Sequence, residues 1–214
     1  MIIRRMVCNP LQENCYVVSD DSSECVIIDC GAFFPEEHDA LRRYIRQEAL
    51  RPVHLLATHG HLDHLFGNQM VYEEYGLRVE ICAEDRFLID DLPGQASSMF
   101  GMRIPERQPG VSRWLADGDS IAFGSHRLRV IQTPGHTPGS ALFYCEEEQV
   151  VFTGDTLFRR SIGRTDLEGG SWPRMAESLR TRVAVLPGDT VVMSGHGPQT
   201  TIGEELTHNP YLRG

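Results

Sequence analysis

The sequence predicts an α/β fold in which two mixed β-sheets pack together with helices on the outside. Both halves of the chain run through hairpins, then a helix, then a further strand. The stretches VVSDDSSECVIIDCG and ALFYCEEEQVVFTGD, one in each half, share a layout of strand, polar turn and strand. A duplicated arrangement of this kind buries its apolar faces by packing sheet against sheet. No stretch rich in Pro, Gly or Ser separates the halves, so we expect a single domain over residues 1–214.

The first half alternates short apolar runs with turn residues, which is typical of strands and hairpins. The expected strands cover residues 2–7, 14–20, 25–29, 53–58 and 78–83. A helix is expected over 35–50, because Pro35 suits a first helical turn and acidic residues precede the arginines. A second helix is expected from about 65 to 75. Residues 91–113 show weak periodicity and many helix breakers, so we expect a long loop that forms a lid or binding loop.

The second half begins again with hairpins and ends with a helix and a strand. Its expected strands cover residues 120–123, 126–132, 141–145, 149–155 and 190–195. The expected helix covers roughly 171–182. The order of elements therefore repeats that of the first half.

The composition restricts the partners and the location of the protein. Hydrophobic residues make up 41% of the chain and charged residues 23%, as in an ordinary globular protein. The formal net charge of −10 argues against a nucleic acid as partner, because phosphate binding needs a basic surface. No apolar run approaches the roughly 18–20 residues that cross a bilayer, and Arg4 and Arg5 stand where a secretion signal needs apolar residues. We therefore expect a cytoplasmic protein with no nucleic-acid or membrane partner.

Histidines and aspartates follow four of the expected strands at the point where each strand ends. The motif THGHLDH occupies residues 58–64, and His136, Asp155 and His196 follow three strands of the second half. Glycines at these corners allow sharp turns and close backbone approach. If the strands share a direction, their ends lie along one edge of the fold, where loops on a rigid scaffold can build a site.

The chemistry of these side chains fits a centre with two metal ions. Imidazoles and carboxylates are ligands of zinc and its first-row neighbours. Seven such residues follow the strands: His59, His61, Asp63, His64, His136, Asp155 and His196. Seven donors are too many for one tetrahedral ion, and they suit two ions about 3.5–4 Å apart that share a carboxylate. The imidazoles of an H-x-H pair can point to one side of an extended chain, whereas the adjacent Asp63 and His64 diverge toward a second ion.

Four motifs resemble, in order, those of the metallo-β-lactamase superfamily: THGHLDH, TPGHTPGS, FTGDT and SGHGP, which span residues 58 to 198. The resemblance implies a four-layer αββα sandwich. It also implies two ligand sets, with His59, His61 and His136 for the first ion, Asp63, His64 and His196 for the second, and Asp155 bridging the two. Asp29, at the end of an expected strand, is expected either to orient the first loop from behind the ligands or to form a simple turn.

A centre of this kind predicts hydrolysis of an acyl compound. Two divalent ions, with zinc expected and iron or manganese as alternatives, lower the pKa of bound water from 15.7 to about 7. They also polarise a carbonyl group and offset the charge of the tetrahedral intermediate. Asp63 and Asp155 are the residues expected to place the attacking hydroxide.

Two further stretches narrow the substrate. GDTLFRRSIGRTDLEGG and HGPQTTIGEELTHNPYL resemble the short bacterial subgroup of glyoxalase II, the hydroxyacylglutathione hydrolases, without the C-terminal helical domain of the full-length enzymes. The resemblance implies a small-molecule thioester such as S-lactoylglutathione. Arg159, Arg160 and Arg164 form a local basic island suited to an anionic thioester, with solvated surface charges as the alternative for Arg159 and Arg160. Arg164 matches a basic residue that contacts glutathione in the family, with an ion pair to Asp166 as the alternative. Asp166 itself stands where the family has a tyrosine.

Other functions are less consistent with the sequence. A β-lactamase is disfavoured by the expected absence of an export signal and by Asp155, which stands where many of those enzymes have a cysteine ligand. A ribonuclease is disfavoured by the acidic balance and the short chain. Persulfide dioxygenases resemble this chain in the same motifs, including a G-R-T-D element at 163–166, and hold one iron through residues that match His59, His136 and Asp155. The stretches SIGR and HNPYL favour the hydrolase over the dioxygenase. A third alternative, a metal-binding module without catalysis, is the least consistent with a full ligand set beside a basic segment.

Overall fold

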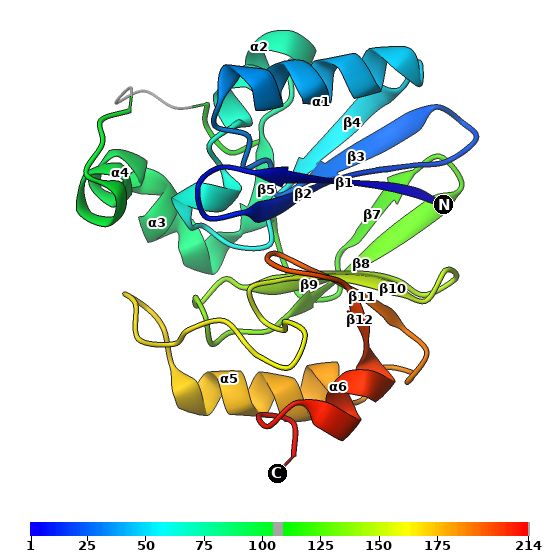
Figure 1. Cartoon of the computed structure of the whole chain (residues 1–214), viewed down its shortest axis with the longest axis vertical. Coiled ribbons are helices and arrows are strands. Elements are labelled where there is room, and N and C mark those ends of the chain that lie inside the picture. Colours follow the sequence, from blue (N-terminus) through cyan, green and yellow to red (C-terminus); the bar gives the residue numbers. More distant parts are fainter. Residues whose placement is uncertain (105–108, 214) are drawn as a thin grey trace.

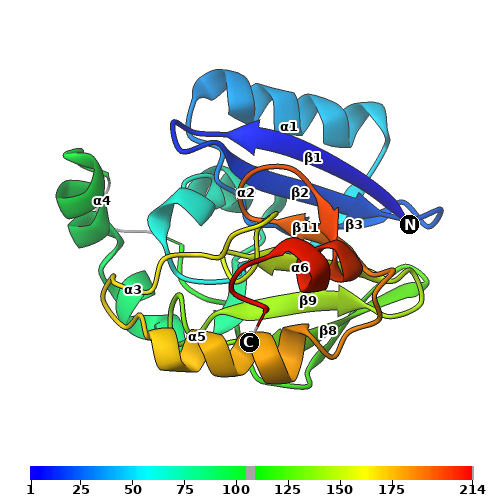
Figure 2. The same ribbon diagram turned by 60° about the horizontal axis from the view of Figure 1, so that its bottom comes forward.

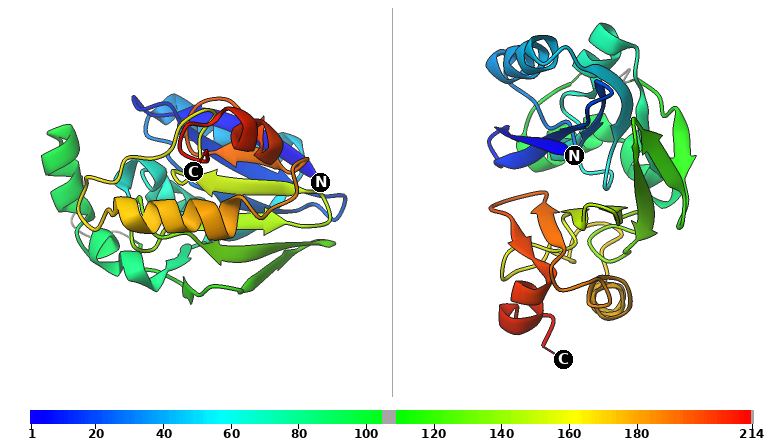
Figure 3. Two further views of the ribbon diagram at one scale, coloured as in Figure 1. Left: turned by 90° about the horizontal axis from the view of Figure 1, so that it is seen from below. Right: turned by 90° about the vertical axis from the view of Figure 1, so that its right-hand side faces the viewer.

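Two six-stranded mixed sheets face each other in the computed structural model, which describes residues 1–104 and 109–213 (Figure 1). Helices cover the outer face of each sheet, so the layers follow the order helix, sheet, sheet, helix, as the end-on view in Figure 3 shows. The predicted αββα sandwich is confirmed. None of the helices in the described part of the chain is long and apolar enough to span a membrane.

The first sheet has the order β1-β2-β3-β4-β5-β6. Its strands are β1 (Ile2–Cys8), β2 (Glu13–Ser19), β3 (Glu24–Ile28), β4 (Arg51–Leu56), β5 (Val79–Cys82) and β6 (Arg113–Leu115). The first three strands pair antiparallel, and β3 to β6 pair parallel. Helices α1 (Pro35–Gln47) and α2 (Asn68–Tyr75) pack on its outer face through a cluster that includes Leu41 and Val71.

The second sheet has the order β12-β11-β10-β9-β8-β7. Its strands are β7 (Ser120–Phe123), β8 (His126–Gln132), β9 (Ala141–Cys145), β10 (Val150–Gly154), β11 (Val191–Ser194) and β12 (Thr200–Thr201). Helix α5 (Trp172–Ser178), which continues into a π-helical turn over Leu179–Val183, and α6 (Ile202–His208) cover its outer face (Figure 2).

The apolar core between the sheets comes from side chains that alternate along the strands. On β3, Val26 and Ile28 face the second sheet, whereas Ile27 faces α1 and α2. Phe143 and Phe152 of the second sheet complete the central cluster and are almost entirely buried. Each such side chain contributes roughly 1.5–3 kcal/mol through burial, so this core holds the facing sheets, and the loops at their edge, in place.

The structure corrects two predictions in the first half. The expected loop over 91–113 is wrong, because α4 (Leu92–Phe100) follows α3 (Arg86–Asp90) and β6 begins at the last residue of the segment; residues 105–108 lie outside the described residues. The helix breakers stand at positions that tolerate them: Pro93 lies in the first turn of α4 and Gly101 ends it in a left-handed conformation. The helix expected from about 65 begins only at Asn68, and the preceding segment Leu62–His64 forms a 3₁₀ turn instead.

Candidate metal site

Four loops at one edge of the facing sheets carry the predicted donors. The loop after β4 bears four of them: His59, His61, Asp63 and His64. The loop after β8 bears His136, and the ends of β10 and β11 lead to Asp155 and His196. Strands β8, β10 and β11 run in one direction, as expected, since β9 is antiparallel to β8 and β10 and β11 is parallel to β10. The two sheets meet at this edge, where Ala141 donates its backbone N–H to the carbonyl of Thr58 at 2.9 Å.

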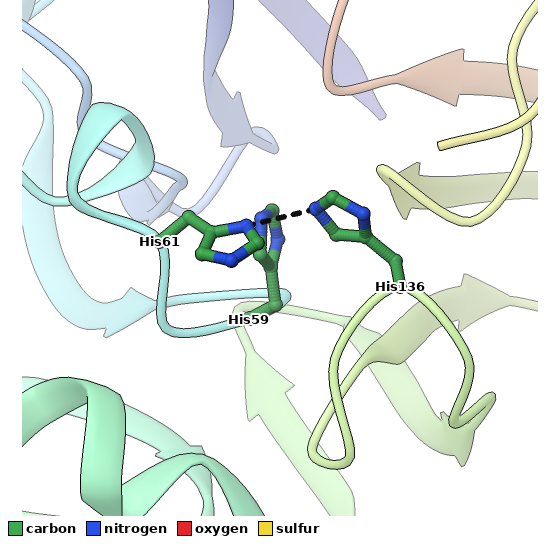
Figure 4. A group of neighbouring side chains, drawn as sticks. All are labelled: His59, His61 and His136. Atoms are coloured by element: carbon green, nitrogen blue, oxygen red, sulfur yellow. Dashed lines mark hydrogen bonds between the residues drawn. The ribbon is translucent and has the colours of Figure 1, made fainter. Parts of the chain in front are cut away.

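Three histidines form the first group of donors (Figure 4). The ligand atoms of His59, His61 and His136 all lie within 4.8 Å of one another, and His61 Nδ1 lies 2.9 Å from His136 Nε2. His136 Nδ1 donates to the carbonyl oxygen of Arg164 at 2.7 Å, so its Nε2 presents a lone pair to the group. His59 Nδ1 lies 3.1 Å from Thr58 Oγ1, and His59 Nε2 is buried without a hydrogen-bond partner. The rings of His136 and His59 are therefore each oriented by a partner outside the donor groups.

The second group consists of Asp63, His64 and His196, whose ligand atoms also lie within 4.8 Å of one another. Asp63 Oδ2 lies 3.3 Å from His196 Nε2 and 3.6 Å from His64 Nε2. His196 Nδ1 lies 3.1 Å from the carbonyl oxygen of Leu11, and His64 Nδ1 lies 3.2 Å from Asp29 Oδ2. His196 thus has an acceptor at Nδ1, whereas Asp29 lies close to His64 Nδ1 without a hydrogen bond to it; both imidazoles turn Nε2 toward the carboxylate of Asp63.

Asp155 lies between the two groups. Its Oδ2 is 3.5 Å from His136 Nε2, in the first group. Its Oδ1 is 3.3 Å from His64 Nε2 and 3.7 Å from His196 Nε2, in the second group. One carboxylate therefore presents one oxygen to each group, which is the arrangement that a bridging ligand requires.

Burial and mutual charge set the protonation of these side chains. Burial, followed by the neighbouring His136, lowers the pKa of His61 to about 4, and burial lowers that of His59 well below its usual range. Burial also works to lower the pKa of His64, but the carboxylates of Asp63, Asp155 and Asp29 outweigh it and raise that pKa well above its usual range. Two imidazoles of the first group are thus neutral at neutral pH and ready to bind a metal, whereas a metal at the second group must displace a proton.

Unpartnered buried atoms show that the site fits metal ions. His59 Nε2, both ring nitrogens of His64 and Asp155 Oδ1 are buried without a hydrogen-bond partner. Leaving such groups unpaired costs roughly 1–3 kcal/mol each. Metal ions bound to the two groups would satisfy the Nε2 and Oδ1 atoms, and nitrogen and carboxylate donors suit zinc, iron or manganese.

Three polar side chains lie behind the donors. Asp29 has a left-handed backbone with φ of 53°; its carboxylate accepts from Thr58 N at 2.7 Å and Thr58 Oγ1 at 2.8 Å. Asn9 donates from Nδ2 to the carbonyl of Asp63 at 2.8 Å. Glu13 is fully buried 3.9 Å from His64 Nδ1, and burial raises its pKa well above the usual range. Asn9 and Glu13 were not predicted. Their only signal is that the hairpin segment NPLQEN places polar residues beside strands that are otherwise apolar.

The predicted substrate residues lie on the loop after Asp155. Arg164 pairs with Asp166 through two hydrogen bonds of 2.7 and 2.8 Å, and its side chain is 61% exposed. Arg160 is also exposed, has a left-handed backbone with φ of 59°, and donates its backbone N–H to Glu205 at 2.7 Å. The structure therefore contains the ion pair predicted as the alternative for Arg164. The backbone carbonyl of Arg164 orients His136, a role of this residue that the sequence did not reveal.

Comparisons with known proteins agree with this geometry. The family model described as the metallo-beta-lactamase superfamily matches residues 8–196. Hydroxyacylglutathione hydrolase GloC from Haemophilus influenzae is 36% identical over 94% of this chain and 93% of its own. A probable metallo-hydrolase, YqgX from Bacillus subtilis, is 35% identical over 99% of this chain and 97% of its own.

Solved structures show the same fold. BLEG-1, described as a B3 metallo-beta-lactamase, superposes with a TM-score of 0.91 at 37% identity over the whole of both chains. TTHA1623 in a di-iron-bound form has a TM-score of 0.86 at 37% identity, covering 98% of this chain and 100% of its own. ETHE1 from Myxococcus xanthus has a TM-score of 0.78 at 27% identity, covering 98% and 84%. The fold, the clustered donors and the family match agree, and the chain belongs to the metallo-β-lactamase superfamily.

Proposed function

We propose that this protein hydrolyses small acyl thioesters, with S-lactoylglutathione as the preferred substrate and two divalent metal ions as cofactors. The observation that carries the proposal is the pair of donor groups that share Asp155, whose two oxygens lie 3.5 and 3.3 Å from His136 Nε2 and His64 Nε2. The thioester is supported by the similarity to a hydroxyacylglutathione hydrolase along nearly the whole chain. Zinc is the proposed metal, and the di-iron form of TTHA1623 makes iron the first alternative.

The seven donors are the residues that would hold the ions. The three histidines of the first group would hold one ion, and Asp63, His64 and His196 would hold the other. When bound, the ions supply Lewis acidity toward a substrate carbonyl and an activated water. The carboxylates of Asp63 and Asp155 are the side chains that we propose would accept hydrogen bonds from that water.

A thiolate leaving group suits this site, because the carboxylates and imidazoles that could act as a general acid would be bound to the metal ions. A thiolate, with a pKa of about 8.5, departs without a proton from a dedicated acid. An amide nitrogen, by contrast, must be protonated before it leaves. A thioester can therefore be hydrolysed here without a further side chain that protonates the leaving group.

The basic segment after Asp155 is the proposed anion contact for the substrate. Phe158 packs edge-on against His196 with ring centroids 5.9 Å apart, which brings the start of the segment next to the second donor group. Arg160 and Arg164 follow on the same loop and are exposed. A chain with a formal net charge of −10 needs such a local basic patch to attract an anionic thioester. We also place the protein in the cytoplasm, because its six cysteines are free and buried, as is usual in a reducing compartment.

A second candidate is a persulfide dioxygenase with a single iron. It is supported by the proximity of His136 Nε2 to Asp155 Oδ2, at 3.5 Å, with His59 beside them. Three donors of this type with open positions are the ligand set of many non-haem iron oxygenases. This candidate leaves Asp63, His64 and His196 without a common role, which is why we prefer the hydrolase.

Paired assays on one metal-analysed preparation distinguish the candidates. We expect about two divalent ions per chain, release of free thiol from S-lactoylglutathione, and no oxygen uptake with glutathione persulfide. One iron per chain with oxygen uptake would establish the dioxygenase instead. A chromogenic β-lactam belongs in the same experiment because of the similarity to BLEG-1. Faster cleavage of the β-lactam than of the thioester, or a metal-loaded protein that turns over none of the three, would reject the proposal.

A further inference from the structure

A buried carboxylate outside the donor set connects two of the loops that carry the first donor group. Asp85 follows β5 at the end of a 3₁₀ turn, Ala83–Asp85, and is 0% exposed. Its Oδ2 accepts from the backbone N–H of Gly60 at 2.8 Å and from Thr137 Oγ1 at 2.7 Å. Its Oδ1 accepts from the backbone N–H of Gly139 at 2.6 Å. Both carboxylate oxygens are therefore used by the loops.

These bonds reach the chain next to the histidines. Gly60 stands between His59 and His61, and Thr137 directly follows His136. The two loops belong to different sheets, since the first follows β4 and the second follows β8. A single side chain on a third segment thus ties the two loops together where His61 Nδ1 and His136 Nε2 come within 2.9 Å.

Asp85 stands at the start of α3, where its carboxylate would be expected to bond to the helix instead of to the two loops. Asp85 is the N-cap residue of α3, and aspartate at that position ordinarily accepts a hydrogen bond from the first turn of the helix. Its side chain makes no such cap bond. The carboxylate turns instead toward the two loops, although burial of a charge is costly unless it is well hydrogen-bonded.

The backbone of both loops comes close to Asp85. A Cβ on Gly139 would lie 2.6 Å from Asp85 Cγ, and one on Gly60 would lie 3.1 Å from Asp85 Cβ. Any residue with a side chain at these positions would push the loops away from the carboxylate. Gln95 of α4 holds the other side of the first loop, donating to the carbonyl of Gly60 at 3.0 Å and accepting from Leu62 N at 3.1 Å.

We propose that Asp85 is a positioning residue that sets the spacing between the His59–His61 loop and the His136 loop, and so sets the metal affinity of the first donor group. Residues that orient metal ligands from behind typically change metal affinity by about 10- to 100-fold when they are lost. Asp85 bonds to two backbone N–H groups and one hydroxyl of the loops, and to none of the imidazoles. Its loss therefore widens the distribution of distances among the three nitrogens without removing any of them. The inference rests on the metal-binding role in the proposed function.

The test replaces the hydroxyl that joins one loop to Asp85. Thr137→Val keeps the shape of the side chain and removes its bond, Thr137→Ser keeps the bond, and Asp85→Asn places an N–H against one of the donors. We expect a visible-absorption titration with Co²⁺, in competition with a chelator, to show one of two Co²⁺ equivalents weakened about tenfold by Thr137→Val and tenfold to a hundredfold by Asp85→Asn. Thr137→Ser should stay within threefold of the wild type. If Asp85→Asn does not fold, the Thr137 pair carries the test.

A matched control separates positioning from general stability. Thr200 Oγ1 donates to the buried Glu205 at 2.7 Å, on β12 and away from both loops. Thr200→Val should lower the melting temperature of the metal-free protein about as much as Thr137→Val, with both Co²⁺ equivalents unchanged. If Thr137→Val lowers the melting temperature as much as Thr200→Val but leaves the Co²⁺ affinity unchanged, the proposal is overturned. It is also overturned if Thr200→Val weakens Co²⁺ binding as much as Thr137→Val does. A wild type that binds no Co²⁺ would reject the proposed function as well. A wild type that binds Co²⁺ without hydrolysing thioesters would reject the proposed function alone.

Discussion

At the residue scale, three of the histidine donors have a polar partner behind the ring, while the other nitrogen of the ring faces the donor groups. His136 donates to the Arg164 carbonyl at 2.7 Å, and His196 Nδ1 lies 3.1 Å from the Leu11 carbonyl. His59 reaches Asp29 through Thr58, because the Thr58 hydroxyl that faces His59 Nδ1 donates to Asp29 Oδ2 at 2.8 Å. Orientation of this kind fixes the tautomer and leaves one nitrogen of each ring for a metal.

Asp155 is the residue whose loss should be the most damaging to the site. Burial works to raise its pKa, but His64 and the other imidazoles outweigh that and hold the pKa well below its usual range, so the group is an anion that can bridge two cations. We expect Asp155→Ala to lower metal content from about two ions per chain to one or fewer and activity by at least 10³-fold, measured by metal analysis and thiol release. Asp189→Ala, at an exposed loop position, is the control and should retain both. Full activity in Asp155→Ala would refute the bridging role.

Arg164 should act on the anionic part of the substrate. Its ion pair with Asp166 is exposed, so exchange of that partner for a substrate carboxylate costs little. We expect Arg164→Ala to raise KM about tenfold for a glutathione thioester and to leave KM for a neutral thioester within twofold. Asp166→Ala frees the same guanidinium and should leave KM for the glutathione thioester unchanged or lower. Equal effects of Arg164→Ala on the two substrates would show that the arginine does not contact the anion.

At the scale of elements, the first donor loop is held by short segments that follow β5 as well as by its own strand. Helices α3 and α4 extend along one side of the molecule (Figures 1 and 2). Gln95 of α4 bonds to Gly60, Leu62 and the carbonyl of Leu88, so one buried amide joins the donor loop to both helices. A segment that the sequence presents as a loop is therefore part of the support of the site.

Loss of the Gln95 amide should destabilise this support. Gln95→Leu fills the same space but leaves the N–H of Leu62 and the carbonyl of Gly60 without partners, at roughly 1–3 kcal/mol for each group that water does not reach. We expect the free energy of unfolding of the metal-free protein to fall by about 2–4 kcal/mol in chemical denaturation. Ser98→Ala, on the exposed side of the same helix, should change it by less than about 0.5 kcal/mol. A change in Gln95→Leu as small as that in Ser98→Ala would mean that α4 does not support the loop.

At the scale of the whole molecule, the two sheets are joined by the shared core and by polar contacts at their edges. His54 of β4 illustrates this, because Nδ1 pairs with Glu80 of β5 while Nε2 lies 3.2 Å from the carbonyl of Ala122 on β7 of the second sheet. The hydrogen bond to Glu80, opposed in part by burial, raises the pKa of His54 above its usual value. The charged form of this histidine therefore holds three strands and both sheets together.

This contact predicts a pH-dependent contribution to stability. A raised folded-state pKa stabilises the fold fully below the unfolded pKa of about 6.5, and the contribution is lost as the pH rises through the folded pKa. The wild type should exceed His54→Gln in free energy of unfolding by about 1 kcal/mol near pH 6, and the excess should shrink toward pH 9. This excess is measured by chemical denaturation of both proteins in the same buffers and at a fixed metal concentration. The titrations that the two proteins share cancel when the free energy of unfolding of one is subtracted from that of the other. An excess that is constant with pH would contradict this role of His54.

How much the sequence predicts depends on how local each feature is. The strands other than β6 and β12, the helix α1 and the αββα order follow from periodicity, turn residues and the duplicated layout, all of which are carried by neighbouring residues. Helix α4 was missed because the pattern shows Pro93 and Gly101 as breakers and does not show that they stand at the first turn and the end of a helix. Helices α3 and α6 and strands β6 and β12 were missed because they are short.

The sequence by itself determined which chemical groups the site contains and that each follows a strand. Residues that follow strands of the same direction lie at the same edge of the fold, whatever its other elements are. Only the tertiary structure decided which atoms face one another: the two oxygens of Asp155 toward different groups, Glu13 behind His64, and Asp85 between two loops. Asp85 lies 25 residues from Gly60 and 52 from Thr137 along the chain. Contacts over such separations are made by the packing of the sheets, and no local pattern records them.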